Sequence, residues 1–108
     1  MENAYSNQMR KGMLVLVLLK LIGSREVYVA DMLARLQSTE FATQEGTLYP
    51  LLAKLKKEQL IGYRWVESEA GPPRKYYTLT DAGKAKVQEL EAYLHGLSKE
   101  ITKLGEQL

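Results

Sequence analysis

Apolar residues recur at intervals of three and four along the last third of the chain, which is the spacing of one helix face. From residue 87 onward the steps are 3, 4, 3, 4, 3 and 4. A strict repeat of this kind is typical of a seam between two helices, because a face that packs on a globular core is broader. We therefore predict a long helix over residues 81–108, which pairs with a partner helix through Val87, Leu90, Leu94, Leu97, Ile101, Leu104 and Leu108.

The N-terminal part of the chain carries a denser apolar pattern. Every residue from Met13 to Ile22 except Lys20 is apolar, so a helix here has no polar face and is expected to be buried on all sides. We predict it over about 7–22, ending at Gly23, with a second subunit over its outer side. The stretch is about half as long as a membrane-spanning helix and lacks a cleavage site. We therefore expect no membrane association and a cytoplasmic protein.

Between these helices the pattern predicts two shorter helices and a hairpin. Apolar stripes predict helices over 27–36 and 44–59, the second capped by Thr43. Pro50 lacks a backbone donor, so this helix either begins near Thr47 or bends at the proline. Alternation predicts strands over 61–68 and 74–79, with turn residues at 69–73 and Thr80 as cap of the last helix.

This order of elements predicts a mainly α fold with a small β-hairpin. Two helices, a short connection and a third helix form a helix-turn-helix, and the hairpin behind them makes it a winged version. We expect residues 1–80 to form a winged helix-turn-helix DNA-binding domain and residues 81–108 to form a C-terminal dimerisation helix.

Composition narrows the chemistry that this fold is expected to perform. The chain has no cysteine and one histidine, which excludes disulfides, thiolate metal sites and multi-histidine sites. We find no paired carboxylates in a catalytic setting and no nucleophile with a base, so we expect neither an enzyme nor a cofactor. The net charge is only +2, and the positive excess lies in residues 1–20 and 43–80.

The location of this charge favours double-stranded DNA as the partner. In a helix-turn-helix the third helix enters the major groove and reads bases from its N-terminal part. The candidates for base contact are Gln44, Glu45, Thr47 and Tyr49, and those for phosphate contact are Lys54, Lys57, Arg10, Lys11, Arg74 and Lys75. The lysines are alternatively solvated surface charges. We expect the aromatic residues of the hairpin, Tyr63, Trp65, Tyr76 and Tyr77, to pack within the strands, and the tyrosine hydroxyls leave a contact with DNA or a ligand open.

Two segments resemble the PadR family of bacterial transcriptional regulators. They are Gln-Glu-Gly-Thr-Leu-Tyr-Pro-Leu-Leu at 44–52 and Arg-Lys-Tyr-Tyr-Thr-Leu-Thr-Asp-Ala-Gly at 74–83. The single C-terminal helix is similar to the short subfamily, whose members dimerise through it. The resemblance implies a homodimeric repressor of a palindromic operator, with DNA contacts at Thr47, Tyr49, Arg74 and Lys75.

The resemblance also implies release from DNA by a small molecule or another signal. The expected effector is a small aromatic or hydrophobic compound bound between the subunits. Drug-sensing members of the short subfamily carry a tryptophan on the last helix, whereas Tyr93 and Leu94 occupy that region here.

A different class of function fits the same elements. A winged-helix module could use its heptad helix to bind another protein without reading DNA. Substitution of Lys54, Arg74 and Lys75 by alanine separates the two functions. It should weaken the DNA binding of a repressor and leave the partner binding of a protein-binding module unchanged.

Overall fold

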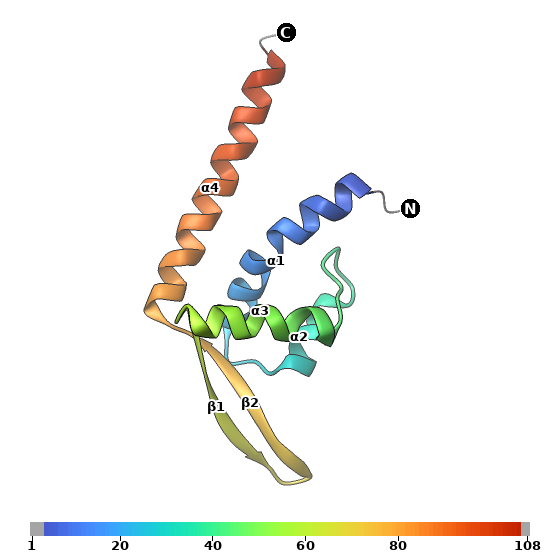
Figure 1. The fold of residues 1–108 in the computed structure, drawn as a ribbon, viewed down its shortest axis with the longest axis vertical. Coiled ribbons are helices and arrows are strands. Elements are labelled where there is room, and N and C mark those ends of the chain that lie inside the picture. The colour runs from blue at the N-terminus through green and yellow to red at the C-terminus, as the bar shows by residue number, and fades with distance from the viewer. Residues whose placement is uncertain (1–3, 107–108) are drawn as a thin grey trace.

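The computed structural model describes residues 4–106, which form a helical body with a projecting hairpin and a projecting helix (Figure 1). The predicted fold class, mainly α with one antiparallel hairpin, is confirmed. The elements in chain order are α1 (Ala4–Ser24), α2 (Val29–Leu36), α3 (Glu45–Lys57), β1 (Ile61–Ser68), β2 (Gly71–Leu79) and α4 (Asp81–Glu106).

The core lies where the first three helices meet the base of the hairpin. Each helix contributes the apolar stripe that its sequence carries, and the hairpin adds Ile61 and Tyr77. The buried helical side chains include Leu18, Leu19 and Ile22 of α1, Val29 and Met32 of α2, and Leu48, Leu52 and Leu55 of α3. This packing fixes α3 on the surface of the body with one face inward.

Three predicted features of the first two helices are wrong in detail. Helix α1 begins before residue 7 and continues through Gly23 to Ser24, so Gly23 does not end it. Gly23 lies so near Leu79 that a Cβ added to Gly23 would be 2.8 Å from the Leu79 side chain. Helix α2 begins at Val29 because Val27 instead forms an antiparallel bridge with Tyr77.

The two ends of α3 are closed by backbone bonds. Gln44 is its N-cap and no side chain caps it, so the prediction of Thr43 as the cap is wrong. At the other end Gln59 adopts a positive φ of 62°, and Leu60 N donates to Leu55 O at 3.0 Å. This is a Schellman closure that glycine usually provides. The helix begins at Glu45 and not near Thr47, so Pro50 lies inside it.

The hairpin is tied to the helical body at its base. Strands β1 and β2 pair in register from Ile61 opposite Leu79 to Val66 opposite Arg74, with an irregularity between Val66 and Ser68. Strand β2 begins at Gly71, three residues before the predicted start, because the turn is shorter than its proline content indicated. The bridge between Val27 and Tyr77 adds a short third partner, with N–O distances of 2.8 and 3.3 Å.

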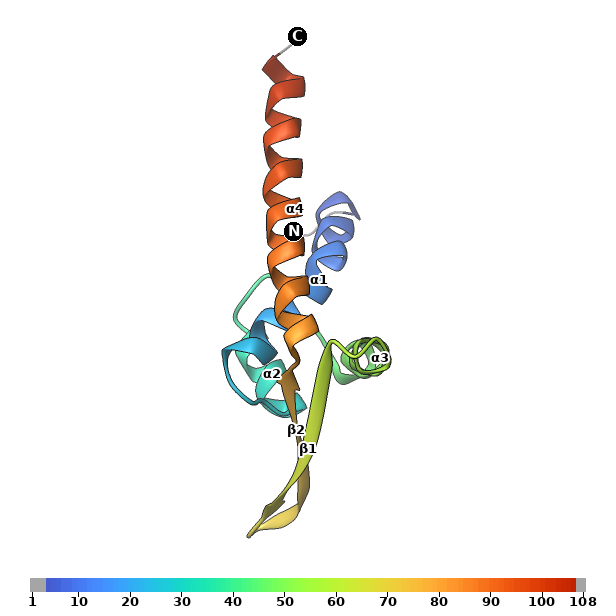
Figure 2. The same ribbon diagram turned by 90° about the vertical axis from the view of Figure 1, so that its left-hand side faces the viewer.

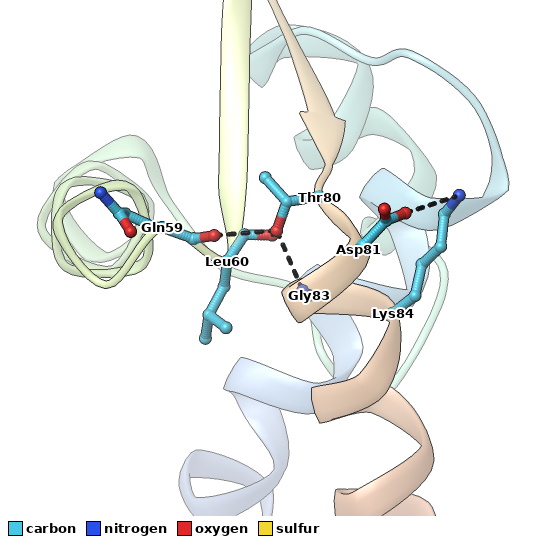
Figure 3. A network of polar contacts seen from close by, with 6 residues as sticks. All are labelled: Gln59, Leu60, Thr80, Asp81, Gly83 and Lys84. Atoms are coloured by element: carbon cyan, nitrogen blue, oxygen red, sulfur yellow. Dashed lines mark hydrogen bonds and ion pairs between the residues drawn. The ribbon is translucent and has the colours of Figure 1, made fainter.

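The junction between the hairpin and α4 is bonded to the end of α3 (Figure 3). Thr80 is the predicted N-cap, and its Oγ1 accepts from Gly83 N at 3.0 Å. The same hydroxyl donates to the carbonyls of Gln59 and Leu60 at 2.8 and 2.9 Å. Gly83 is buried, and an added Cβ would lie 2.1 Å from Leu60 O. The start of α4 and the end of α3 are therefore in direct backbone contact.

Beyond this junction α4 extends away from the body (Figures 1 and 2). The described chain measures 62 × 35 × 20 Å and has a radius of gyration of 16.3 Å. A compact chain of this length would have about 13 Å. Lys20 and Glu91 form a 3.1 Å ion pair between α1 and α4. In the described part of the chain, no helix has the length and apolarity to cross a bilayer.

Candidate nucleic-acid interface

The N-terminal half of α3 offers an uncovered face. Leu48, Leu52 and Leu55 point into the core and Leu51 packs against it, so the positions on the opposite side of the helix point outward. Gln44 and Thr47 are exposed, and Tyr49 retains 50% of its surface. Glu45 is exposed as well, so all four predicted base-contact residues lie on the solvent-facing side of this half of the helix.

Small residues separate these side chains on α3. Gly46, Pro50 and Ala53 are exposed and follow each other at helical spacing. Because Pro50 has no N–H, the carbonyl of Gly46 lacks its usual helical donor. A surface of this kind allows a close approach of the helix backbone to another molecule.

Arg10 and Lys11 lie beside the start of α3. Together with Thr47 they line a hollow of about 190 Å³ between the N-terminal part of α1 and the segment that enters α3. Arg10 is 19% exposed and lies 3.7 Å from Glu40, whereas Lys11 is exposed. Lys11 is therefore the more accessible of these two predicted phosphate contacts.

Arg74 and Lys75 lie on the other side of the same helix. They line a second hollow, of about 420 Å³, together with Tyr49 of α3 and Trp65 of β1. The guanidinium of Arg74 lies over the ring of Tyr28 at 4.6 Å from its centroid. Tyr28 also packs edge-on against Tyr76 at 5.2 Å.

A bidentate ion pair fixes the hairpin against the segment that precedes α2. Arg64 Nε and Nη2 donate to the Glu26 carboxylate at 2.7 and 3.0 Å. These hydrogen bonds lower the pKa of Glu26 below its ordinary value. On the other face of the hairpin, burial raises the pKa of the Tyr77 phenol. Arg64 is exposed but paired with a carboxylate, whereas Arg74 and Lys75 lie against aromatic rings.

Lys54 and Lys57 lie apart from the other predicted contacts. Both are exposed in the last turn of α3, where Lys56 also lies and where cations interact favourably with the helix dipole. The structure therefore groups Gln44, Thr47 and Tyr49 with the cations at 10–11 and 74–75, and leaves Lys54 at the far end of the helix.

Three aromatic residues whose role the sequence left open belong to this surface. Tyr28 supports Arg74, and Tyr63 and Trp65 lie beneath Lys75. Tyr63 and Trp65 are 42% and 62% exposed, and their rings also contact each other within the strands, as predicted. The alternation of side chains along the strand indicates that these two residues belong together, because it places residues 63 and 65 on one face.

The predicted seam of α4 divides into two parts. Val87 and Leu90 are partly buried against the core of their own chain. The following seam residues are increasingly uncovered, with exposed fractions of 37% for Leu94 and Leu97, 68% for Ile101 and 65% for Leu104. Leu108 lies outside the described residues. Residues 13–17 of α1 are only half-buried, so the predicted burial of this helix on all sides is not achieved within one chain.

An apolar groove of about 880 Å³ runs between α1 and α4. Leu16, Val17 and Leu21 form one wall, and Leu94 forms part of the other. Its lining also includes the polar residues Lys20, Arg35, Glu91 and His95. Among residues 4–106 there is no cluster of three or more histidine or acidic side chains that could hold a metal ion.

Comparisons with known proteins identify the family. The model of the transcriptional regulator PadR-like family matches residues 18–89 of this chain. An uncharacterized protein of Lysinibacillus sphaericus is 30% identical over 83 residues, which cover 74% of this chain and 76% of that protein.

Solved structures of PadR regulators have the same fold. A PadR-like transcription factor from Bacteroides fragilis is 41% identical, with a TM-score of 0.80 over 94% of this chain and 99% of the other. A PadR family regulator from Eggerthella lenta is 30% identical, with a TM-score of 0.86 over 94% and 88%. One from Bacillus cereus is 36% identical, with a TM-score of 0.79 over 90% and 95%. These matches confirm the predicted winged-helix fold, and the chain belongs to the PadR-like family of transcriptional regulators.

Proposed function

We propose that this protein is a homodimeric repressor that binds a palindromic operator through α3 and the hairpin. The observation that carries the proposal is the grouping of Gln44, Thr47 and Tyr49 on an exposed helix face with surface cations on both sides. Side chains of this kind read base edges, and the flanking cations bind phosphates and set the register. Residues 1–80 would form the DNA-binding unit and residues 81–108 the dimerisation helix.

The exposed apolar face of α4 supports the homodimer. Four seam residues, Leu94, Leu97, Ile101 and Leu104, remain uncovered, and the half-buried face of α1 is adjacent to this helix. Burial of such surface against a second copy would contribute about 25 cal/mol per Å². A twofold pair would place two copies of α3 on one side of the duplex, where half-sites are about 34 Å apart.

The junction at Thr80 supports a mechanism for release from DNA. Because α4 is bonded to the end of α3 and to the hairpin, a change in the spacing of the two α4 helices would move both reading helices. The groove between α1 and α4 is apolar and fits a small aromatic or hydrophobic effector. Effector binding would then favour the dimer geometry that fits the operator less well.

A titration against the chain's own promoter tests the proposal. We expect binding to a palindromic fragment at least tenfold tighter than to random DNA at the same salt concentration. Equal affinity for both would contradict operator recognition. Action on chromosomal DNA also implies a cytoplasmic location, which fractionation of cells would check.

The same titration separates DNA binding from a winged-helix module that binds only proteins. Alanine at Lys54, Arg74 and Lys75 should weaken DNA binding and reduce its salt dependence, while the dimer remains intact. If these changes leave DNA affinity unaltered, the apolar groove is better explained as a site for another protein.

A further inference from the structure

The two faces of the hairpin carry different cations. Residues directly opposite each other in an antiparallel pair share a face, and Trp65 is opposite Lys75 while Tyr63 is opposite Tyr77. Arg64, opposite Tyr76, lies on the other face, as does Arg74. The adjacent residues Arg74 and Lys75 therefore point to opposite sides of the hairpin.

Lys75 lies against two aromatic rings on its face. Its Nζ is 4.3 Å from the ring centroid of Tyr63 and 5.2 Å from that of Trp65. The two rings meet edge to face, with centroids 6.4 Å apart and an interplanar angle of 85°. Tyr63 in turn contacts Tyr77, which is only 5% exposed, at 5.9 Å. The rings thus connect the ammonium group to the core.

The rings hold the ammonium group without neutralising it. Arg64 on the opposite face is paired with Glu26, whereas no carboxylate of residues 4–106 lies within ion-pair distance of Lys75. An aromatic face attracts a cation through its quadrupole and leaves the full charge available. Lys75 also borders the hollow that separates the hairpin from Tyr49 of α3.

We propose that Tyr63 and Trp65 are positioning residues, which hold the Lys75 ammonium group beside this hollow so that it binds a DNA phosphate. The inference rests on the proposed DNA-binding function and adds two residues to it. A lysine side chain loses much conformational freedom when its charge is fixed, and a charge held before binding loses less at that moment. The exposure of Trp65 follows, since its ring serves the cation and not the core.

A double-mutant cycle tests the positioning role. We expect Lys75→Ala to weaken DNA binding about five- to tenfold and to reduce the salt slope by about 0.9 per chain. Trp65→Ala should weaken binding about two- to fivefold, and Trp65→Phe should remain within about twofold of the wild type. In the Lys75→Ala background, Trp65→Ala should have no further effect. Additive losses would mean that Trp65 contacts DNA by itself and would overturn the proposal.

A matched lysine and a measurement without DNA complete the experiment. Lys99→Ala, on the exposed surface of α4, should leave affinity and salt slope unchanged. Trp65 is the single tryptophan of the chain, so its fluorescence reports its surroundings directly. Emission of the free protein should change in Lys75→Met, and unchanged emission would overturn the positioning role alone. Absence of DNA binding by the wild type at every salt concentration would overturn the proposed function and this inference together.

Discussion

Gly83 is the position at which a single methyl group should disturb the fold most specifically. An added Cβ would lie 2.1 Å from the carbonyl oxygen of Leu60 and 2.6 Å from Leu79 Cδ1. The Leu60 oxygen belongs to the backbone and cannot rotate away, so the start of α4 must move by about 1 Å. Overpacking of this kind costs about 3 kcal/mol. Alanine is favoured over glycine in a helix by about 1 kcal/mol, which leaves a net destabilisation of about 2 kcal/mol.

Gly96 is the matched control for this substitution. It lies in the same helix on the exposed side, and nothing lies within 4 Å of an added Cβ. Gly96→Ala should therefore stabilise the protein by about 1 kcal/mol. Thermal unfolding followed by far-ultraviolet circular dichroism at one protein concentration compares the variants. We expect Gly83→Ala to lower Tm by about 10 °C and Gly96→Ala to raise it by about 5 °C. A Gly83→Ala protein that melts at or above the wild-type temperature would refute the close contact between α4 and Leu60.

Three further predictions concern the cap, the ion pair and the seam. Thr80→Ala should destabilise the protein by about 1 kcal/mol in chemical denaturation, and Thr80→Ser should restore most of the loss because it keeps the hydroxyl. Arg64→Met should raise the pKa of Glu26, as measured by carboxyl NMR titration, because the hydrogen bonds that lower it from its ordinary value of 4.5 are removed. A lowered carboxyl pKa stabilises the folded state at pH values above the unfolded pKa. The stability advantage of the wild type over Arg64→Met should therefore shrink as pH falls below about 4.5. An advantage that grows as the pH falls would contradict this prediction. Ile101→Asp should convert the proposed dimer to a monomer of 12.3 kDa in sedimentation analysis, and a dimer of unchanged affinity would exclude the outer part of α4 as the interface.

Periodicity predicted most of the helices because their apolar stripes have to be buried whatever they pack against. The core residues Leu48, Leu52 and Leu55 follow directly from their spacing. The ends of the elements followed less well. Thr43 has the side chain of a cap but does not act as one, since cap geometry depends on the path of the preceding loop.

The predicted contact residues on α3 and the hairpin lie together, but the sequence did not reveal what supports them. Arg74 and Lys75 are adjacent in the chain and point to opposite faces, where Tyr28 supports the first and Tyr63 and Trp65 the second. Tyr28 is distant from Arg74 along the chain, whereas Tyr63 and Trp65 lie on the strand that pairs with that of Lys75. Their approach depends on strand register and on the bridge between residues 27 and 77.

The sequence by itself determined that α4 is a helix with a narrow apolar seam, because a repeat of three and four residues fits no other regular structure. Only the tertiary structure decided that Val87 and Leu90 pack on their own chain while Ile101 and Leu104 remain uncovered. The physical reason is the direction in which α4 leaves the body, which the contact of Gly83 with Leu60 and the Thr80 hydrogen bonds fix. A pattern of side chains specifies which face must be buried, and the packing of the whole chain specifies what buries it.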